Sequence, residues 1–310
     1  MRRLSIAVAD PKRAFNSAIR RFKEKFLWES YYRALPRHKT RGWIPHKPEI
    51  HDAVLQELRA EGYDTQDYII DPADYRRYLE MANYERFPNY YHGGTSANFT
   101  EKSLEHYLAA RFLDLSRDDL YIDIANDGAP VPEIYHGLFG CEAYRQDIKF
   151  KPGVNGRTIG GDAARLPVPS NFATKMALHC SFEHFELDSD VGFIREAGRV
   201  LRDGGRLVVV PLYLFEEYAI QVDPVTLPKG AHIFDAAARI YGARGYGNRH
   251  GRFYNVRQFT SRIRNNLGPL HLTVYVVRNE REIDPSCYAK FIAVCQKNAS
   301  LLLGCSPKTS

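Results

Sequence analysis

The chain is poor in cysteine, methionine and tryptophan, and it has no long hydrophobic run. Its 310 residues include five cysteines, three methionines and two tryptophans. The number of cysteines is odd and no two have the close spacing of a redox or metal motif, so free thiols in a reducing compartment are expected. No apolar stretch approaches the ~20 residues that span a bilayer, and the apolar run near the start is too short for a signal peptide. These absences predict a cytoplasmic protein without a transmembrane helix.

Positive charge is abundant but unevenly placed. The net charge is +6, and residues 1–47 contain thirteen lysines and arginines against three acidic residues. Residues 11–35 have the spacing of an amphipathic helix. Its apolar side is formed by Phe15, Ile19, Phe22 and Phe26. Two interpretations remain open: the stripe packs onto the protein's own core, or the basic helix lies on the inner face of an anionic membrane or docks a protein partner.

The most regular pattern in the chain runs from Arg157 to Leu214. Short apolar runs alternate there with turns and with one helix whose apolar positions recur at helical spacing. The expected elements are a strand at 158–159, a strand at 173–178, a helix from about Ser189 that is ended by Gly204 and Gly205, and a strand at 206–214. This alternation predicts one half of a parallel α/β sheet.

Three strings within this region carry a family resemblance. They are GDAARLPVPSNF at 161–172, FEHF at 182–185 and REAGRVLRDGGRLVVV at 195–210. Their order and spacing resemble the second half of a class I S-adenosylmethionine-dependent methyltransferase of the type 11 kind. The resemblance implies a Rossmann-like α/β fold with a seven-stranded sheet, the last strand antiparallel and helices on both faces. It also implies S-adenosyl-L-methionine as the methyl donor.

The resemblance divides the chain into parts. It covers roughly Glu101 to Lys297 and leaves the N-terminal part unaccounted for. We therefore expect a basic helical N-terminal extension, a methyltransferase domain with an inserted lid over the acceptor pocket, and a short tail. The expected bounds are 1–95 for the extension, 96–300 for the domain, 215–255 for the lid and 301–310 for the tail.

The loop after the first strand, 120–124, departs from the family pattern. The family has three glycines after an acidic residue; here Asp123 matches the acidic residue and only Gly128 remains among the glycines. Asn126, Asp127 and Gly128 all tolerate left-handed backbone, so a tight turn is still expected. The resemblance implies that Asp147 holds the ribose hydroxyls. The residues expected to contact the cofactor are Asp123, Ala125, Asp127, Gly128, Asp147, Asp162, Ala163 and His179, with Asp162 and Ala163 at the adenine.

Two histidines are candidates for proton transfer. His179 follows the fourth strand of the family sheet and is the first choice for a general base, with His184 second. A structural role is the alternative for each. The string HCSFEH resembles a zinc motif with one residue too many, and no metal is predicted. Tyr90, Tyr91 and His92 either cover the methionine end of the cofactor or seal the sheet edge.

The insertion after the fifth strand is rich in arginine and aromatic residues. Arginine forks beside aromatic rings suit an anionic sugar, glycan or other acidic small molecule, which we expect to be methylated on oxygen. A solvated basic loop is the alternative. The predicted acceptor-binding residues are Tyr213, Arg244, Arg249, His250, Arg252 and Tyr254. Two other functions stay open: a catalytically decayed scaffold, suggested by the glycine-poor loop, and an RNA methyltransferase, although nucleic acid is not the expected partner.

Overall fold

The computed structural model describes residues 11–226 and 234–298 and divides the chain into two compact units. The smaller unit combines the residues up to Pro45 with Glu217–Phe253, and the larger unit combines His46–Glu216 with the residues from Tyr254 onward. Residues 46–95, expected in the N-terminal extension, therefore belong with the large sheet. The inserted segment Glu217–Phe253 forms a unit together with the N-terminal segment, and its expected role as a lid stays a prediction. The expected tail, 301–310, lies outside the described residues.

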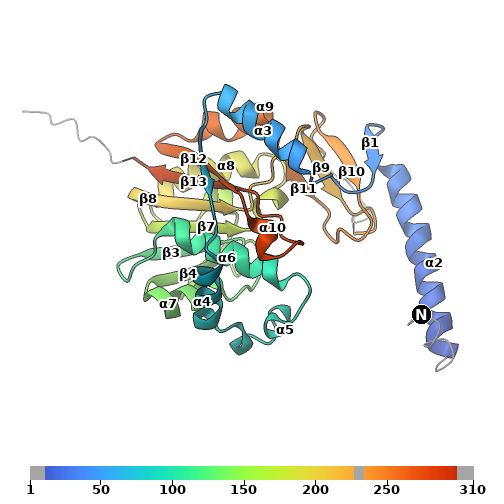
Figure 1. Ribbon diagram of the computed structural model, residues 1–310, viewed down its shortest axis with the longest axis horizontal. Helices are drawn as coiled ribbons and strands as arrows, with labels where there is room; N and C mark the ends of the chain where they lie inside the picture. Colours follow the sequence, from blue (N-terminus) through green and yellow to red (C-terminus); the bar gives the residue numbers. More distant parts are fainter. Residues whose placement is uncertain (1–10, 227–233, 299–310) are drawn as a thin grey trace, which may run out of the picture. The chain divides into compact units, whose positions relative to one another are not determined.

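The larger unit is built on one mixed sheet of nine strands (Figure 1). The order across the sheet is β2 (Asp64–Tyr68), β12 (Leu270–Val277), β13 (Phe291–Lys297), β8 (Leu201–Val210), β7 (Ala173–His179), β3 (Leu120–Ile124), β4 (Glu142–Asp147), β6 (Thr158–Gly160) and β5 (Gly153–Asn155). β13 is antiparallel to both of its neighbours. The seven expected strands are present, and β2 and β5 extend the sheet at its two edges.

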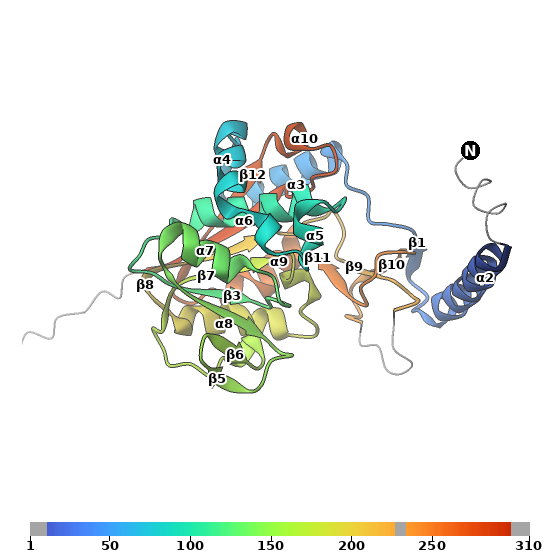
Figure 2. The same ribbon diagram turned by 90° about the horizontal axis from the view of Figure 1, so that it is seen from below.

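The central strands are apolar because both faces of the sheet are covered. Ile122 of β3 lies between Met176 of β7 and Tyr144 of β4 in the ladder, and Ile122 and Met176 are fully buried. α6 (Phe99–Leu113) and α7 (Val131–Phe139) lie on one face and α8 (Ser189–Val200) lies on the other (Figure 2). Helices on both faces confirm the predicted fold class.

Other helices complete the larger unit, and one of them, α4 (Pro72–Ala82), carries a clear local start signal. α4 begins after Asp71, whose side chain accepts a hydrogen bond from the backbone of Ala73, and a proline occupies its first turn. The others are α3 (Pro48–Ala60), α5 (Tyr91–Gly94), α9 (Val256–Arg262) and α10 (Glu280–Ile283).

One helix end differs from the prediction. α8 ends at Val200, and the glycine pair expected to end it lies inside β8 instead. A Cβ on Gly205 would come within 2.9 Å of the carbonyl oxygen of Thr174 in β7. The pairing of β7 and β8 shifts its register between Ala173 and Lys175. The glycine therefore permits a close backbone approach at this irregularity in the sheet.

The smaller unit contains a helix and a four-stranded sheet. The helix is α2 (Pro11–Ala34), and the sheet order is β1 (Lys39–Arg41), β10 (Arg239–Gly242), β9 (Ala219–Val222) and β11 (Gly251–Phe253). The end of α2 packs on this sheet, because a Cβ on Gly242 would come within 2.9 Å of the Tyr32 ring. Arg41 forms two 2.8 Å hydrogen bonds with Glu29 and covers the Tyr32 ring.

Within the described residues of the smaller unit, the apolar stripe of α2 is exposed. Phe15, Phe22 and Phe26 are 66%, 72% and 67% exposed. Only the last turns of the helix, with Trp28 and Tyr32, are buried. Within the described residues, no helix combines the length and the apolar character needed to cross a bilayer.

Candidate functional site

The carboxyl ends of the parallel strands bring the predicted cofactor residues to one edge of the sheet. Asp123 is the second-last residue of β3, Asp147 is the last residue of β4, and His179 is the last residue of β7. Asp162 follows β6 by two positions. Ligands of open α/β sheets bind outside this edge, so the topology places these side chains where a ligand is expected.

The loop after β3 keeps a tight turn without the family's glycines. Ala125, Asp127 and Gly128 have φ angles of 52°, 47° and 86°, so the left-handed residues include Ala125 rather than Asn126. Asn126 instead uses its side-chain amide, which donates to Asp123 Oδ2 at 2.5 Å and to the carbonyl of Ala129 at 2.8 Å. An amide side chain therefore stabilises this turn.

Gln146 holds the same loop from the neighbouring strand, a role that no sequence motif indicates. Its side-chain oxygen accepts a hydrogen bond from the backbone of Ala125 at 3.1 Å, and its amide donates to the carbonyl of Gly161 at 2.6 Å. The residue is 1% exposed. Gln146 thus connects the loop after β3 with the loop after β6.

Asp123 is buried in a polar pocket below the loop. Besides the bond from Asn126, it accepts a 3.0 Å hydrogen bond from the hydroxyl of Tyr121. Burial raises the pKa of Asp123 to about 7, although both hydrogen bonds oppose this shift. Asp123 therefore holds the turn together and is not open to solvent.

Asp147 and Asp162 differ in exposure. Asp147 is buried, and each of its oxygens accepts one backbone hydrogen bond of 2.9 Å, from Asp127 and from Lys149. A carboxylate oxygen has two lone pairs, so each oxygen of Asp147 keeps one for the two hydroxyls of a ribose. Asp162 is exposed and caps the turn Ala163–Arg165 through the backbone of Ala164. The acceptors at this edge fit the nucleoside end of S-adenosylmethionine.

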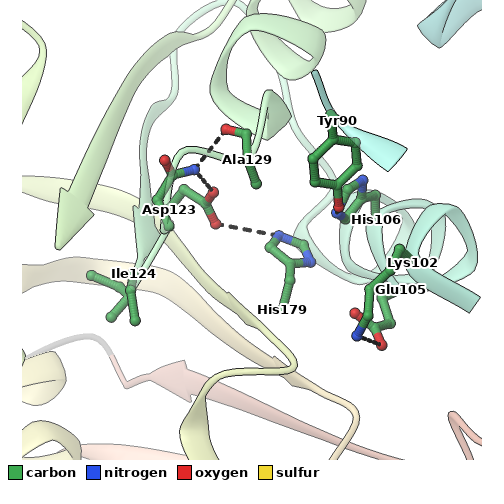
Figure 3. A pocket seen from close by; sticks show the side chains of 10 residues that line it. Tyr90, Lys102, Glu105, His106, Asp123, Ile124, Ala129 and His179 are labelled. Carbon is green, nitrogen blue, oxygen red and sulfur yellow. Dashed lines mark hydrogen bonds and ion pairs between the residues drawn. The ribbon is translucent and has the colours of Figure 1, made fainter. Parts of the chain in front are cut away.

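A cavity of about 40 Å³ lies between α6 and the loop after β3 (Figure 3). Its polar lining includes Tyr90, Lys102, Glu105, His106, Asp123 and His179. Sites that enclose a whole ligand usually measure roughly 300–1,000 Å³, whereas a cavity of about 10–15 Å³ already holds one water. The cavity therefore has room for one small polar group, and a nucleoside must lie outside it, against the open edge.

His179 is held in one orientation at the cavity wall. Its Nε2 lies 3.2 Å from the hydroxyl of Tyr121, which itself donates to Asp123. His179 must then donate from Nε2, and this leaves the lone pair on Nδ1. Burial, with Lys102 nearby, lowers the pKa of His179 to about 3, so the ring is neutral. His179 ends β7 and lines the cavity, and its general-base role stays a prediction.

Several lining residues come from segments that the sequence patterns did not single out. His106 lies edge-on to His179 at a centroid distance of 4.9 Å, between the hydroxyls of Tyr84 and Tyr90. Burial lowers the pKa of His106 well below its usual value. Tyr90 lines the cavity, and its neighbours Tyr91 and His92 are not part of the lining. Its expected contact with the methionine end of the cofactor stays a prediction.

The other catalytic candidate lies outside the cavity. His184 belongs to the turn Phe182–His184 and lies 3.5 Å from Glu183. Cys180, next to His179, has a left-handed φ of 49° and donates from its thiol to Glu183 at 3.2 Å. The same sulfur lies 3.5 Å from the hydroxyl of Tyr213, one of the predicted acceptor residues. Among the described residues, no group of three His, Cys, Asp or Glu side chains is arranged to hold a metal ion.

The predicted acceptor residues are divided between the two units. Arg244, Arg249, His250 and Arg252 belong to the smaller unit, whereas Tyr213 and Tyr254 belong to the larger one. Tyr254 is buried, and its hydroxyl donates to Asp190 at 2.6 Å, a contact typical of a structural role. Sequence spacing alone could not show that the insertion folds with the N-terminal segment.

One comparison with known proteins, with a protein-family model, agrees with the motifs. Residues 140–209 match the family model described as a methyltransferase domain. Curated proteins give no match. Among solved structures, the chain is similar to the YcgJ protein from Bacillus subtilis, with 19% identity and a TM-score of 0.32 over 39% of this chain and 53% of that one. The chain thus spans about half the length of that protein.

Two further structures align over more of the chain. Burkholderia thailandensis 1,6-didemethyltoxoflavin-N1-methyltransferase has 13% identity and a TM-score of 0.43, over 76% of this chain and 94% of that one. Geranyl diphosphate C-methyltransferase from Streptomyces coelicolor has 12% identity and a TM-score of 0.40, over 66% and 85%. Residues 140–209, the segment that carries Asp147, Asp162 and His179, thus resemble a methyltransferase domain.

Proposed function

We propose that the chain transfers a methyl group from S-adenosylmethionine to a small-molecule acceptor. The observation that carries this proposal is Asp147, a buried carboxylate at the end of β4 whose two oxygens each keep one lone pair. In this proposal Asp147 holds the ribose hydroxyls, and Asp162 with the backbone of Ala163 holds the adenine. The left-handed turn from Ala125 to Gly128 lies beside the methionine end.

The bound sulfonium supplies an activated methyl group. The protein's own task is then to align the acceptor with that methyl group and to keep water away from it. His179, His106 and Asp123 are fixed by buried hydrogen bonds and suit this positioning role. The narrower prediction, O-methylation of an anionic sugar or glycan, depends on the arginines of residues 217–253.

Replacing Asp147 by asparagine is expected to weaken S-adenosylmethionine binding by about tenfold or more, because charge-assisted hydrogen bonds to the ribose are lost. Isothermal titration of the full-length protein measures this change. Glu142→Asn is a suitable control, since Glu142 is exposed at the start of the same strand. No heat with wild-type protein at millimolar S-adenosylmethionine would contradict the proposal and favour a catalytically decayed scaffold.

We also propose that α2 contacts an anionic membrane surface from the aqueous side. Its exposed phenylalanines form the apolar side of a basic helix, and Arg21, Lys23 and Lys25 are exposed with them. Such helices bind in the headgroup region through apolar burial together with attraction to anionic lipids.

The change Phe22→Ser with Phe26→Ser is expected to lower the vesicle-bound fraction about tenfold, since each burial of a phenylalanine contributes about 1.5–3 kcal/mol at most. Flotation with vesicles of phosphatidylcholine and phosphatidylserine measures it. Trp43→Ser is the matched control, because Trp43 is 55% exposed in the same unit but outside the helix. Equal flotation of the double variant and the wild-type protein would refute the membrane contact.

A further inference from the structure

On the wall of the cavity formed by α6, one buried hydrogen-bond acceptor receives no hydrogen bond from the described residues. Glu105 is fully buried, and one of its oxygens accepts from Lys102 at 2.7 Å. The other oxygen, Oε2, has no hydrogen-bond partner among the described residues. Figure 3 shows the Lys102–Glu105 pair on α6 facing the cavity from the side opposite Asp123. A buried acceptor without a partner costs free energy unless a ligand or water supplies a donor.

A second acceptor of the same kind lies across the cavity. His179 donates from Nε2 to Tyr121, so the lone pair is on Nδ1. This nitrogen is buried and lacks a partner within the described part of the chain. In Figure 3 it is the ring nitrogen turned away from Asp123, toward the α6 side. Glu105 and His179 thus offer two acceptors to whatever occupies the cavity.

Negative charge exceeds positive charge in the surrounding cluster. Glu101, Glu105 and Glu183 are 2%, 0% and 3% exposed. Lys102 donates a hydrogen bond to Glu105. Glu101 Oε1 also has no hydrogen-bond partner among the residues described. Buried carboxylates require a compensating cation or a proton, and burial raises the pKa of Glu105 well above its usual value. A ligand with a positive charge would offset this excess.

Aromatic rings border the same cluster. Tyr213 and Tyr288 stack at a centroid distance of 6.2 Å, and both hydroxyls approach Cys180, at 3.5 and 3.9 Å. The backbone nitrogen of Tyr288 donates to Glu101 at 2.9 Å, so the rings are fixed to the acidic residues. Carboxylates beside aromatic faces are the surroundings in which proteins bind ammonium groups.

We propose, on the basis of the proposed methyl transfer, that the acceptor is a small amine whose nitrogen enters this cavity and donates hydrogen bonds to Glu105 and His179. A volume of about 40 Å³ admits an amine head group, while the rest of the acceptor lies outside. The reaction is then an N-methylation. The bound ammonium first releases one proton to water. The neutral amine nitrogen then donates its lone pair to the methyl carbon, and the carbon–sulfur bond breaks with its electron pair retained by sulfur, which leaves a methylated ammonium and an uncharged thioether.

The protonation state of His179 favours an amine over an alcohol as the methyl acceptor. An alcohol must lose its proton as it attacks, and this requires a base whose pKa is close to the working pH. The pKa of His179 is about 3, because burial disfavours the charged ring. A neutral amine attacks through its own lone pair, so a hydrogen-bond acceptor that orients it is sufficient.

Three probes of equal chain length test the proposal on the full-length protein: n-butylamine, n-butanol and butyrate. Saturation-transfer NMR without S-adenosylmethionine is expected to show butylamine binding at least about tenfold more tightly than either of the others. Glu105→Gln keeps the shape and removes the charge, and is expected to reduce butylamine binding by a similar factor. Its affinity for S-adenosylmethionine should stay within about twofold. Glu80→Gln, an exposed position on α4, is the matched control.

The wild-type probe series decides the question even if the Glu105 variant does not fold. Butanol or butyrate binding as tightly as butylamine would overturn the proposal, and preference for butyrate would support the anionic acceptor predicted from the arginine-rich insertion. Unchanged butylamine binding by a folded Glu105→Gln protein would overturn it as well. The calorimetric titration tests methyl transfer separately. Absence of S-adenosylmethionine binding there would contradict methyl transfer and would overturn the N-methylation as well.

Discussion

Replacing Asp190 by alanine is expected to lower the free energy of unfolding by about 3–5 kcal/mol, because breaking a buried ion pair leaves an uncompensated charge. Asp190 is fully buried and accepts from Arg262 at 2.7 and 2.9 Å and from the hydroxyl of Tyr254 at 2.6 Å. These bonds hold α9 against the start of α8. Urea denaturation monitored by circular dichroism measures the change.

A neighbouring aspartate provides the control for this prediction. Asp188 lies 3.0 Å from the same arginine, but its side chain is 87% exposed. Asp188→Ala is therefore expected to cost at most about 1 kcal/mol. The double change Asp190→Ala with Arg262→Met should recover part of the loss, since it removes both charges. Equal losses at the two aspartates would show that burial of Asp190 does not determine its contribution.

The second large effect is expected at Gln146. Gln146→Leu leaves the backbone N–H of Ala125 and the carbonyl of Gly161 without their side-chain partner. Each unsatisfied buried group costs about 1–3 kcal/mol, so a loss of about 2–5 kcal/mol is expected. Because these groups belong to both loops at the proposed nucleoside site, S-adenosylmethionine affinity should fall as well.

Thermal denaturation and calorimetric titration of the same protein measure the two effects at Gln146. Gln66→Leu makes the same chemical change on the exposed edge strand β2 and should leave both quantities unchanged. A Gln146→Leu protein with wild-type stability and wild-type cofactor affinity would show that the two loops hold their conformation independently.

The central sheet could be predicted from the sequence because its strands are short apolar runs. The run at 120–124 became β3 with the same bounds, and the hairpin at the end of the chain became β12 and β13. Both faces of these strands are buried, so nearly every residue in them is apolar. The edge strand β2 has the sequence DTQDY, which carries no such pattern, and it was missed.

The site was only partly predictable. Asp147 and His179 end strands, and the family resemblance predicted site residues at these strand ends. Glu105 and Gln146 lie within a helix and a strand, where a polar residue usually faces solvent, and nothing in the sequence shows that these two are buried. The same limit applies to α2: helical spacing gives the phenylalanine stripe, but only the structure shows that the stripe is exposed.

The smaller unit combines two segments that are far apart in the sequence, so it cannot fold until both have been synthesised. Its sheet pairs β1 with β10, and the hydrogen-bonded residues Thr40 and Arg239 are 199 positions apart. Ribosomes add about 5–20 residues per second, so the N-terminal segment waits on the order of 10–40 s for its partner strand. During that interval an apolar, basic segment is available to chaperones or to the first anionic surface that it meets.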